Sequence, residues 1–197
     1  MNHATQDLTR EEWLHLLTAR YLWPLIKQHS GATPGNVRMS VGFPSGRRNA
    51  NKAVGQCWYP ESSSDKSFEV FVSPVLVAYD VVHTLLHELV HASVGPGHGH
   101  KGPFKRLAVA VGLEGKMTAT VPGDALAAKI KGWLEELPKY PHAKMLPGLE
   151  AGGPKQTTRL IKCQCGECGY TVRTTSKWID LGGAPICPVD NVTMEVA

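Results

Sequence analysis

The sequence lacks the features that mark membrane-spanning, secreted and repeat proteins. No run approaches the roughly eighteen consecutive apolar residues of a transmembrane helix, although 42% of the 197 residues are hydrophobic. The N-terminus has no basic segment followed by an apolar one, as a signal peptide would. No internal repeat or low-complexity tract is present. We therefore expect a soluble, cytoplasmic protein with a buried core and no membrane partner.

Cysteine is also scarce, and its placement is uneven. Four of the five cysteines lie between Cys163 and Cys187. In a cytoplasmic protein, such crowding favours metal binding over a disulfide framework. Cys57 stands apart from the others, and we expect it to behave as a small buried hydrophobic residue.

The hydrophobic pattern predicts an α+β fold. Thr9 and Glu12 form a capping box, which predicts a helix that ends near Gln28. Three strand-like runs separated by turn residues predict a small antiparallel meander, and two later periodic stretches predict helices. The expected strands cover 37–43, 53–59 and 68–73, and the expected later helices cover 103–111 and 123–137.

The most informative stretch of the chain is His87-Glu88-Leu89-Val90-His91. Residues four apart on a helix share one face, so His87 and His91 can hold one Zn²⁺ ion from a single helix. Glu88 is placed to act as a general base, because its carboxylate can reach a zinc-activated water rather than the metal. The apolar residues around the motif predict a helix with Asp80 as its N-cap.

A catalytic zinc usually has three protein ligands, so a third ligand must be found. His98 and His100 both qualify, because the glycine-rich segment 95–99 ends the helix and lets the chain turn back. The metzincin pattern is excluded, since its third histidine would fall at Gly97. A gluzincin-type site would use Glu114, which remains an alternative.

Three other residues are candidates for a supporting role at the zinc site. Tyr140 and His142 lie in a Pro-rich turn, and either side chain could stabilise an oxyanion near zinc. The alternative for both is an ordinary surface turn. His83 lies one turn before His87, and we expect it to pack or hydrogen-bond near the site rather than bind zinc.

The motif and the residues after it resemble the SprT-like metallopeptidases. The resemblance rests on 87–92, Gly99-His100 and 104–107, and it covers roughly residues 70 to 195. In that family the third zinc ligand is a histidine four residues before the aromatic residue that opens the next helix, which matches His100. The segment Gly99–Phe104 and the later 115–120 look more like the short versions encoded by phages and bacteria. A phage origin would place the protein in the host cytoplasm or nucleoid.

The C-terminal segment contains a second candidate zinc site. Cys165 and Cys168 have the spacing of a zinc knuckle, because two thiolates two residues apart fit one tetrahedral edge. A second such pair should follow about twenty residues later, but Cys187 is paired there with Asp190. Either Asp190 ligates through an oxygen, as its position favours, or Cys163 completes a Cys-only site. We expect a structural zinc, because so small a ribbon has too little core to fold securely without its metal.

Basic and aromatic residues of the ribbon give limited support to nucleic-acid binding. The net charge of +4 is modest. Basic groups could contact the phosphates of single- or double-stranded DNA while Tyr170 and Trp178 stack on unpaired bases. The alternative is a solvated surface with Trp178 in the small core of the ribbon. The basic residues are Arg159, Lys162, Arg173 and Lys177, together with Lys155 and, on a turn of the first domain, Arg47, Arg48 and Lys52.

These observations predict a zinc-dependent metallopeptidase. We expect a zincin-like domain at 1–140, a Pro- and Gly-rich linker at 141–154 and a zinc-ribbon-like β segment at 155–197. The resemblance implies protein substrates associated with DNA. Two alternatives remain: a nucleic-acid-binding ribbon protein whose zincin domain is a scaffold, and a zinc hydrolase that acts on a non-peptide amide. The sequence does not indicate the oligomeric state.

Overall fold

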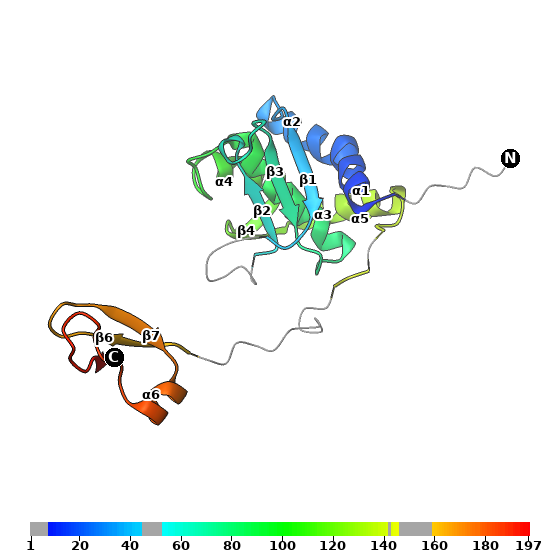
Figure 1. Cartoon of the computed structure of the whole chain (residues 1–197). Helices are drawn as coiled ribbons and strands as arrows, with labels where there is room; N and C mark the ends of the chain where they lie inside the picture. Colours follow the sequence, from blue (N-terminus) through cyan, green and yellow to red (C-terminus); the bar gives the residue numbers. More distant parts are fainter. Residues whose placement is uncertain (1–7, 45–52, 142, 146–158) are drawn as a thin grey trace. The chain divides into compact units, whose positions relative to one another are not determined.

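The computed structural model describes residues 8–44, 53–141, 143–145 and 159–197 (Figure 1). The chain divides into two compact units, Met1–Pro147 and Gly148–Ala197. This division falls within the segment that the sequence assigns to a linker. His142 and Lys155 lie outside the described residues, as do Arg47, Arg48 and Lys52. No helix in the described ranges is both long and apolar enough to cross a membrane.

The first unit contains a mixed three-stranded sheet in the order β1-β3-β2. Strand β1 (Val37–Val41) runs parallel to β3 (Phe68–Val72), and β2 (Gly55–Trp58) runs antiparallel to β3. The predicted antiparallel meander is therefore wrong in its strand order and in one pairing. Strand β3 lies at the centre with a neighbour on each edge, and its side chains Val70 and Val72 are buried in the core. As a consequence, β2 lies at an edge of the sheet.

The N-terminal helical run begins as the capping box predicts. The Glu12 amide donates to Thr9 Oγ1 at 3.2 Å, and the Thr9 amide donates to the Glu12 carboxylate at 2.7 Å. Pro24 has no N–H to donate, and a π-helical turn lies just before it. Gly31 ends the run in the left-handed conformation, with φ of 76°. The run comprises α1 (Arg10–Leu17), a π-helical turn (Thr18–Leu22) and α2 (Trp23–Ser30).

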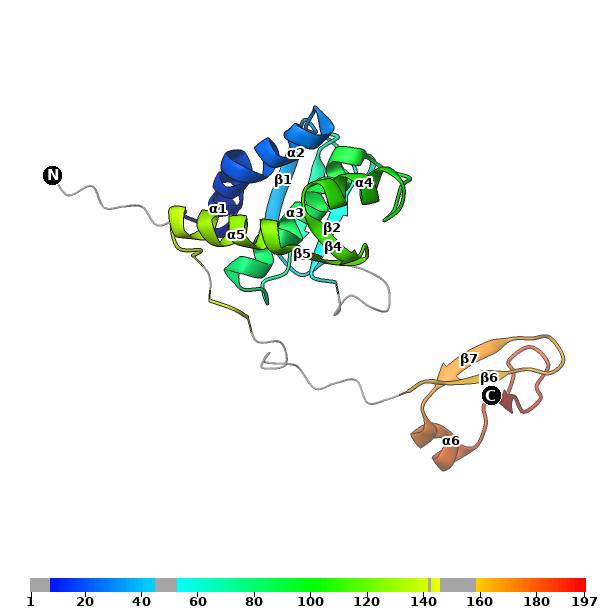
Figure 2. The same cartoon turned by 180° about the vertical axis from the view of Figure 1, so that it is seen from behind.

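Helix α3 (Ala78–Val94) forms the centre of the first unit. It packs against β2 and β3 on one side and against α4 (Pro103–Ala110) and α5 (Asp124–Glu136) on the other. Figure 2 shows α1, α3 and α5 together on one face of the sheet. The predicted N-cap at Asp80 is wrong: Val77 is the N-cap, and Asp80 lies in the first turn, where its charge is favourable to the helix dipole.

A hairpin and a 3₁₀ turn of the first unit were not predicted. Strands β4 (Leu113–Lys116) and β5 (Ala119–Pro122) form an antiparallel hairpin between α4 and α5. Their four-residue length and the exposure of Glu114 and Val121 leave too little apolar alternation to mark them as strands. A 3₁₀ turn at Pro60–Ser62 follows β2.

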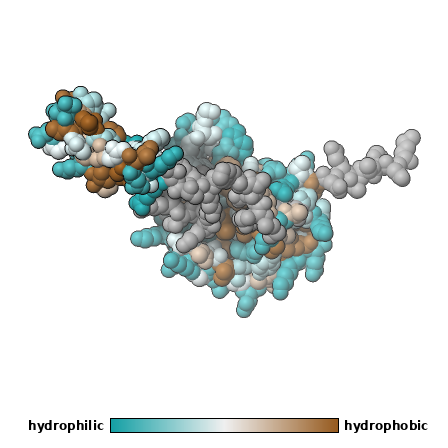
Figure 3. All heavy atoms as spheres, turned by 60° about the horizontal axis from the view of Figure 1, so that its bottom comes forward, coloured by the Kyte–Doolittle hydropathy of each residue, from teal (hydrophilic) through white to brown (hydrophobic). Residues whose placement is uncertain are grey.

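The second unit is a small β structure with a core of four buried residues. Its sheet has the order β7-β6-β8, formed by β7 (Thr171–Thr174), β6 (Ile161–Gln164) and β8 (Glu195–Val196), and α6 (Ser176–Gly182) follows β7. Figure 3 shows hydrophobic surface gathered over this unit. Trp178 is 57% exposed, so it does not belong to the core. The described core consists of Cys163, Cys165, Cys187 and Met194.

Candidate metal centres

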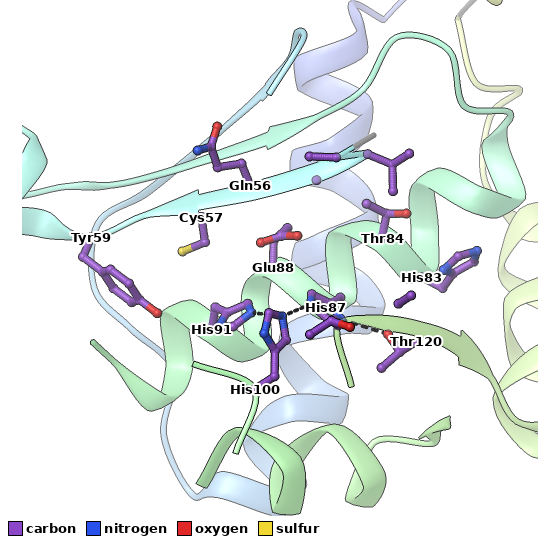
Figure 4. A pocket seen from close by; sticks show the side chains of 15 residues that line it. Gln56, Cys57, Tyr59, His83, Thr84, His87, Glu88, His91, His100 and Thr120 are labelled. Atoms are coloured by element: carbon purple, nitrogen blue, oxygen red, sulfur yellow. Dashed lines mark hydrogen bonds between the residues drawn. The ribbon is translucent and has the colours of Figure 1, made fainter. Parts of the chain in front are cut away.

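Three histidine side chains of the first unit converge on one point (Figure 4). Helix α3 supplies His87 and His91 from consecutive turns, and the segment between α3 and α4 supplies His100. The Nε2 atom of His100 lies 3.2 Å from the Nε2 of His87 and 3.2 Å from that of His91. Two ligands of a tetrahedral zinc at 2.0–2.1 Å are about 3.3 Å apart. Both separations from His100 therefore match those of a zinc site, and all three ligand atoms lie within 4.8 Å of one another.

A glycine-rich turn and a buried aromatic ring bring His100 close to His87 and His91 of α3. The backbone takes positive φ at Gly95, Gly97, Gly99 and Gly102, which reverses the chain after α3. The turn leaves His98 exposed and outside the histidine group. The fully buried ring of Phe104 lies 4.1 Å from the His91 ring, 4.9 Å from the His87 ring and 5.0 Å from the His100 ring, measured between centroids. Glu114, the gluzincin alternative, is an exposed residue of β4 and is not in the group.

Thr120 of β5 fixes the orientation of His87. The His87 Nδ1 lies 2.8 Å from the Thr120 hydroxyl, which is buried beside it. If Nδ1–H donates to this hydroxyl, the lone pair of Nε2 is left for a metal, as is usual for zinc-ligating histidines. Thr120 lies 33 residues from His87 in the sequence. No local pattern marks it, and the sequence analysis missed it.

Burial keeps the histidine group neutral. Desolvation, reinforced by the neighbouring histidines, lowers the pKa of His87 to about 3. Desolvation and His100 lower the pKa of His91 to about 4, and desolvation also lowers the pKa of His100. Neutral imidazoles offer lone pairs rather than protons, so these residues are available as metal ligands near pH 7.

Glu88 lies beside the histidine group with only 7% of its surface exposed. Its carboxylate is directed toward β2 (Figure 4). Burial raises the pKa of Glu88 to about 8 in the absence of a bound ion. A divalent cation held by the three histidines would favour the ionised carboxylate by charge attraction. The group is therefore poised to exchange a proton near neutral pH.

A cavity of about 430 Å³ lies in front of the histidines. Strand β2 forms one wall from Gly55 to Cys57, and the hairpin contributes Thr118–Thr120. Burial raises the pKa of the Cys57 thiol to about 12, so Cys57 is a neutral, partly buried lining residue, close to the role expected of it. Among the described residues that line the cavity, Glu88 is the sole carboxylate, and there is no Lys or Arg.

The structure places Tyr59, rather than Tyr140, at the cavity. Tyr59 follows β2, and its ring lies on the side of His91 (Figure 4). Tyr140 is buried in the hydrophobic core, with its ring 4.7 Å from that of Trp13. Both alternatives for Tyr140, a role at an oxyanion near the metal and an ordinary surface turn, are therefore wrong. His83 lines the cavity without joining the ligand group, and its Nε2 lies 3.4 Å from Asp80 Oδ1.

The second unit brings together Cys165, Cys168, Cys187 and Asp190. The Sγ atoms of Cys168 and Cys187 are 3.6 Å apart, and Asp190 Oδ2 lies 3.2 Å from Cys165 Sγ and 3.6 Å from Cys187 Sγ. In a tetrahedral zinc site, sulfur and oxygen ligands are about 3.6–3.8 Å apart, which the two separations from Cys187 match and the Asp190–Cys165 separation falls below. Cys163 faces the small core instead of this group. Of the two alternatives for the fourth ligand, the geometry brings Asp190 into place.

The two halves of this cluster have the same backbone structure. The Gly169 amide donates to Cys165 O at 3.1 Å, and the Asn191 amide donates to Cys187 O at 2.9 Å. The Cys165 amide donates to Tyr170 O and the Cys187 amide to Val192 O, both at 2.8 Å. Gly169 and Asn191 both have positive φ, 74° and 58°. Asp190 thus occupies in the second knuckle the position that Cys168 occupies in the first.

The candidate nucleic-acid residues of the second unit form a mixed surface. Lys162 lies opposite Arg173 in the strand pairing, and its Nζ donates to Gln164 Oε1 at 2.6 Å. Lys177 Nζ lies 5.2 Å from the centroid of the exposed Trp178 ring. Positive and negative side chains are equal in number in the described part of the unit, so charge there gives nucleic-acid binding little support. They are Arg159, Lys162, Arg173 and Lys177 against Glu167, Asp180, Asp190 and Glu195.

Comparison of the chain with known protein families, with curated proteins and with solved structures finds no match. The fold is α+β, and both ligand groups could hold a metal ion.

Proposed function

We propose that the protein is a zinc metallopeptidase of the SprT-like type that hydrolyses peptide bonds. One observation carries the proposal: three histidines that could hold one metal ion lie next to a buried glutamate and line an open cavity. Three neutral nitrogen ligands leave one position of a tetrahedral ion for water or substrate, which is the arrangement of catalytic rather than structural zinc.

Glu88 is the proton-transferring group of the proposed reaction. Zinc, when bound by His87, His91 and His100, would polarise water and the scissile carbonyl as a Lewis acid. Glu88 accepts a proton from the attacking water and delivers it to the nitrogen of the leaving amine. Tyr59 is our candidate for the donor that stabilises the oxyanion, because it lines the cavity on the side of His91 and its phenol is protonated near pH 7.

The position of β2 favours a peptide over a small amide as substrate. One edge of β2 is paired with β3, and within the described ranges no strand pairs with its other edge. The strand also lines the cavity above α3. An extended peptide can hydrogen-bond to such an edge as an added strand, and this would hold its backbone beside Glu88. The site thus has a means of orienting a chain, which a non-peptide amide hydrolase would not require.

The test is cleavage of a histone, and of the chain itself, with and without single-stranded DNA. We expect the wild type to cleave and Glu88→Gln to lose about 10²–10⁴-fold in rate while keeping its zinc. His91→Ala should lose one of the two zinc ions that we expect per wild-type chain. Full zinc retention by His91→Ala would contradict the ligand assignment. Equal inactivity of zinc-loaded wild type and Glu88→Gln would contradict the peptidase proposal.

A second candidate function is binding of single-stranded nucleic acid by the second unit. It rests on the exposed Trp178 ring with Lys177 beside it. Stacking of a base on such a ring contributes about 1–3 kcal/mol. Trp178→Ala should therefore weaken binding of an oligonucleotide by about 5- to 100-fold. Val189→Ala, which removes another exposed apolar side chain of the same unit, is the matched control. Equal affinity of the two variants would exclude Trp178 as a stacking platform.

A further inference from the structure

Strand β2 passes unusually close to α3 at one residue, Gly55. The φ of Gly55 lies outside the left-handed region, and the residue pairs in regular antiparallel register with Val72. The backbone conformation therefore does not require glycine at this position. A glycine inside a regular strand often marks a close approach by another part of the protein.

The approach at Gly55 is to the glutamate of the active-site motif. A Cβ atom added to Gly55 would lie 2.5 Å from Glu88 Oε1 and 2.9 Å from Glu88 Cγ. It would also lie 2.7 Å from Cγ2 of Thr84, one helical turn earlier. All three distances are shorter than van der Waals contacts of carbon and oxygen. An alanine would have to displace the carboxylate, the strand or both.

We infer that Gly55 is a positioning residue for Glu88. Its missing side chain lets β2 close over the carboxylate, which shields Glu88 from water and leaves it beside the histidines. This role deepens the proposed peptidase function and, as far as catalysis is concerned, rests on it. Misplacement of a reacting group by about 1 Å can reduce a rate about 10²-fold. Gly55→Ala should then lower kcat about 10- to 100-fold with little change in KM or in bound zinc.

The first experiment does not depend on activity or on metal. Thermal unfolding of the first unit is measured in metal-free wild type, Gly55→Ala, Glu88→Ala and the double variant. Overpacking of a buried contact should lower the melting temperature of Gly55→Ala by about 5 °C. In the Glu88→Ala background the same substitution should cost less, because the closest atom, Glu88 Oε1, and Glu88 Cγ are gone and only the approach to Thr84 Cγ2 remains. If Gly55→Ala alone does not fold, a double variant that folds again supports the Gly55–Glu88 contact in the same way.

Two matched variants test whether Glu88, and not a neighbouring residue, is the group that Gly55 accommodates. Gly42 follows β1 in the same sheet, and a Cβ there would meet Phe71 at an ordinary 3.6 Å. Gly42→Ala should leave the melting temperature unchanged or slightly higher, because alanine restricts the unfolded chain. Thr84→Ser deletes the other close atom. If Thr84→Ser, rather than Glu88→Ala, restores the melting temperature of Gly55→Ala, the glycine accommodates Thr84 and the inference is wrong.

The second experiment measures kcat, KM and zinc content of Gly55→Ala and Gly42→Ala. A selective loss of kcat in Gly55→Ala supports the positioning role, and wild-type kcat overturns it. The two proposals can fail separately. If the changes in melting temperature caused by Gly55→Ala and Glu88→Ala add up in the double variant, the Gly55–Glu88 contact is overturned, whatever the activity. If the melting temperatures are non-additive but the wild type cleaves no protein, the contact is supported and the peptidase function is contradicted.

Discussion

The histidine cluster of the first unit is surrounded by a core that does not depend on it, whereas the cysteine cluster of the second unit supplies half of the small core there. Ten of the seventeen residues of α3 are buried, and the apolar cluster around it extends from Trp13 to Tyr140. In the second unit, two of the four described core residues are the candidate ligands Cys165 and Cys187.

This difference predicts different uses of a bound ion. A site preformed by α3 and Phe104 can gain or lose zinc without unfolding, so the ion is available as a reagent. The knuckles around Cys165 and Cys187 have no comparable support, so an ion there would hold the unit together. Ligand type follows the same division, since three neutral nitrogens leave an open position and three thiols with a carboxylate close the coordination sphere.

Removal of metal should have the largest effect on folding, and it should unfold the second unit alone. Structural zinc contributes about 10–16 kcal/mol of apparent binding free energy to small zinc domains. After chelation we expect the amide NMR signals of 159–197 to collapse to unfolded positions while those of α3 remain dispersed. Cys168→Ser should reproduce this result and retain the zinc of the histidine site. Cys57→Ser, which alters a thiol outside both groups, should keep both ions. A second unit that stays folded without metal would remove the contrast between the two sites.

The pH dependence of the metal-free first unit should show the next largest effect. The pKa of Glu88 is about 8 in the folded protein, compared with an ordinary value of 4.5. Because the folded state binds this proton more tightly, the stability that protonation provides is complete below pH 4.5 and is lost as pH rises through 8. Wild type should therefore lose stability relative to Glu88→Gln by about 1.4 kcal/mol for each pH unit between those values.

Urea unfolding between pH 5 and 8, followed by fluorescence in a Trp178→Phe background, measures this difference in the first unit. The lowered pKa values of His87 and His91 act in both proteins and cancel in the comparison. A difference that does not change with pH would mean that Glu88 is not desolvated, and that its surroundings resemble the exposed Asp190 of the second unit.

Loss of the hydroxyl that orients His87 should have a smaller effect, confined to the histidine site. Thr120→Val keeps the shape of the side chain and removes the partner of His87 Nδ1. Partners of this kind typically affect metal affinity by about 10- to 100-fold. Competition with a zinc chelator should show that the zinc affinity of the histidine site falls by this factor and that the zinc affinity of the cysteine site is unchanged. Thr118→Val, in the same hairpin, is the control. Equal affinities would show that Phe104 alone holds the ring.

Replacement of the carboxylate ligand should have the smallest effect. Asp190→Cys completes the second knuckle with a softer ligand in a backbone that already matches the first. We expect zinc release from the second unit to slow by roughly tenfold, with the fold and the histidine site unchanged. Faster release would show that the carboxylate is better suited than a thiolate to this position.

The sequence by itself determined the local parts of both sites. The spacing of His87, Glu88 and His91 on one helix and the Cys165–Cys168 knuckle follow from a helical or turn period of a few residues. The capping box at Thr9 was confirmed for the same reason. Such features depend on backbone geometry within one turn, and the sequence displays that geometry directly.

Only the tertiary structure decided which distant residues meet. The exposure of His98, the approach of Thr120 to His87 and the burial of Tyr140 against Trp13 depend on contacts across many residues. The strand order β1-β3-β2, which makes β2 an edge and brings Gly55 to Glu88, depends on which strand is buried most deeply. These choices are set by competition among pairings of similar local propensity, and the packing of the whole unit decides that competition.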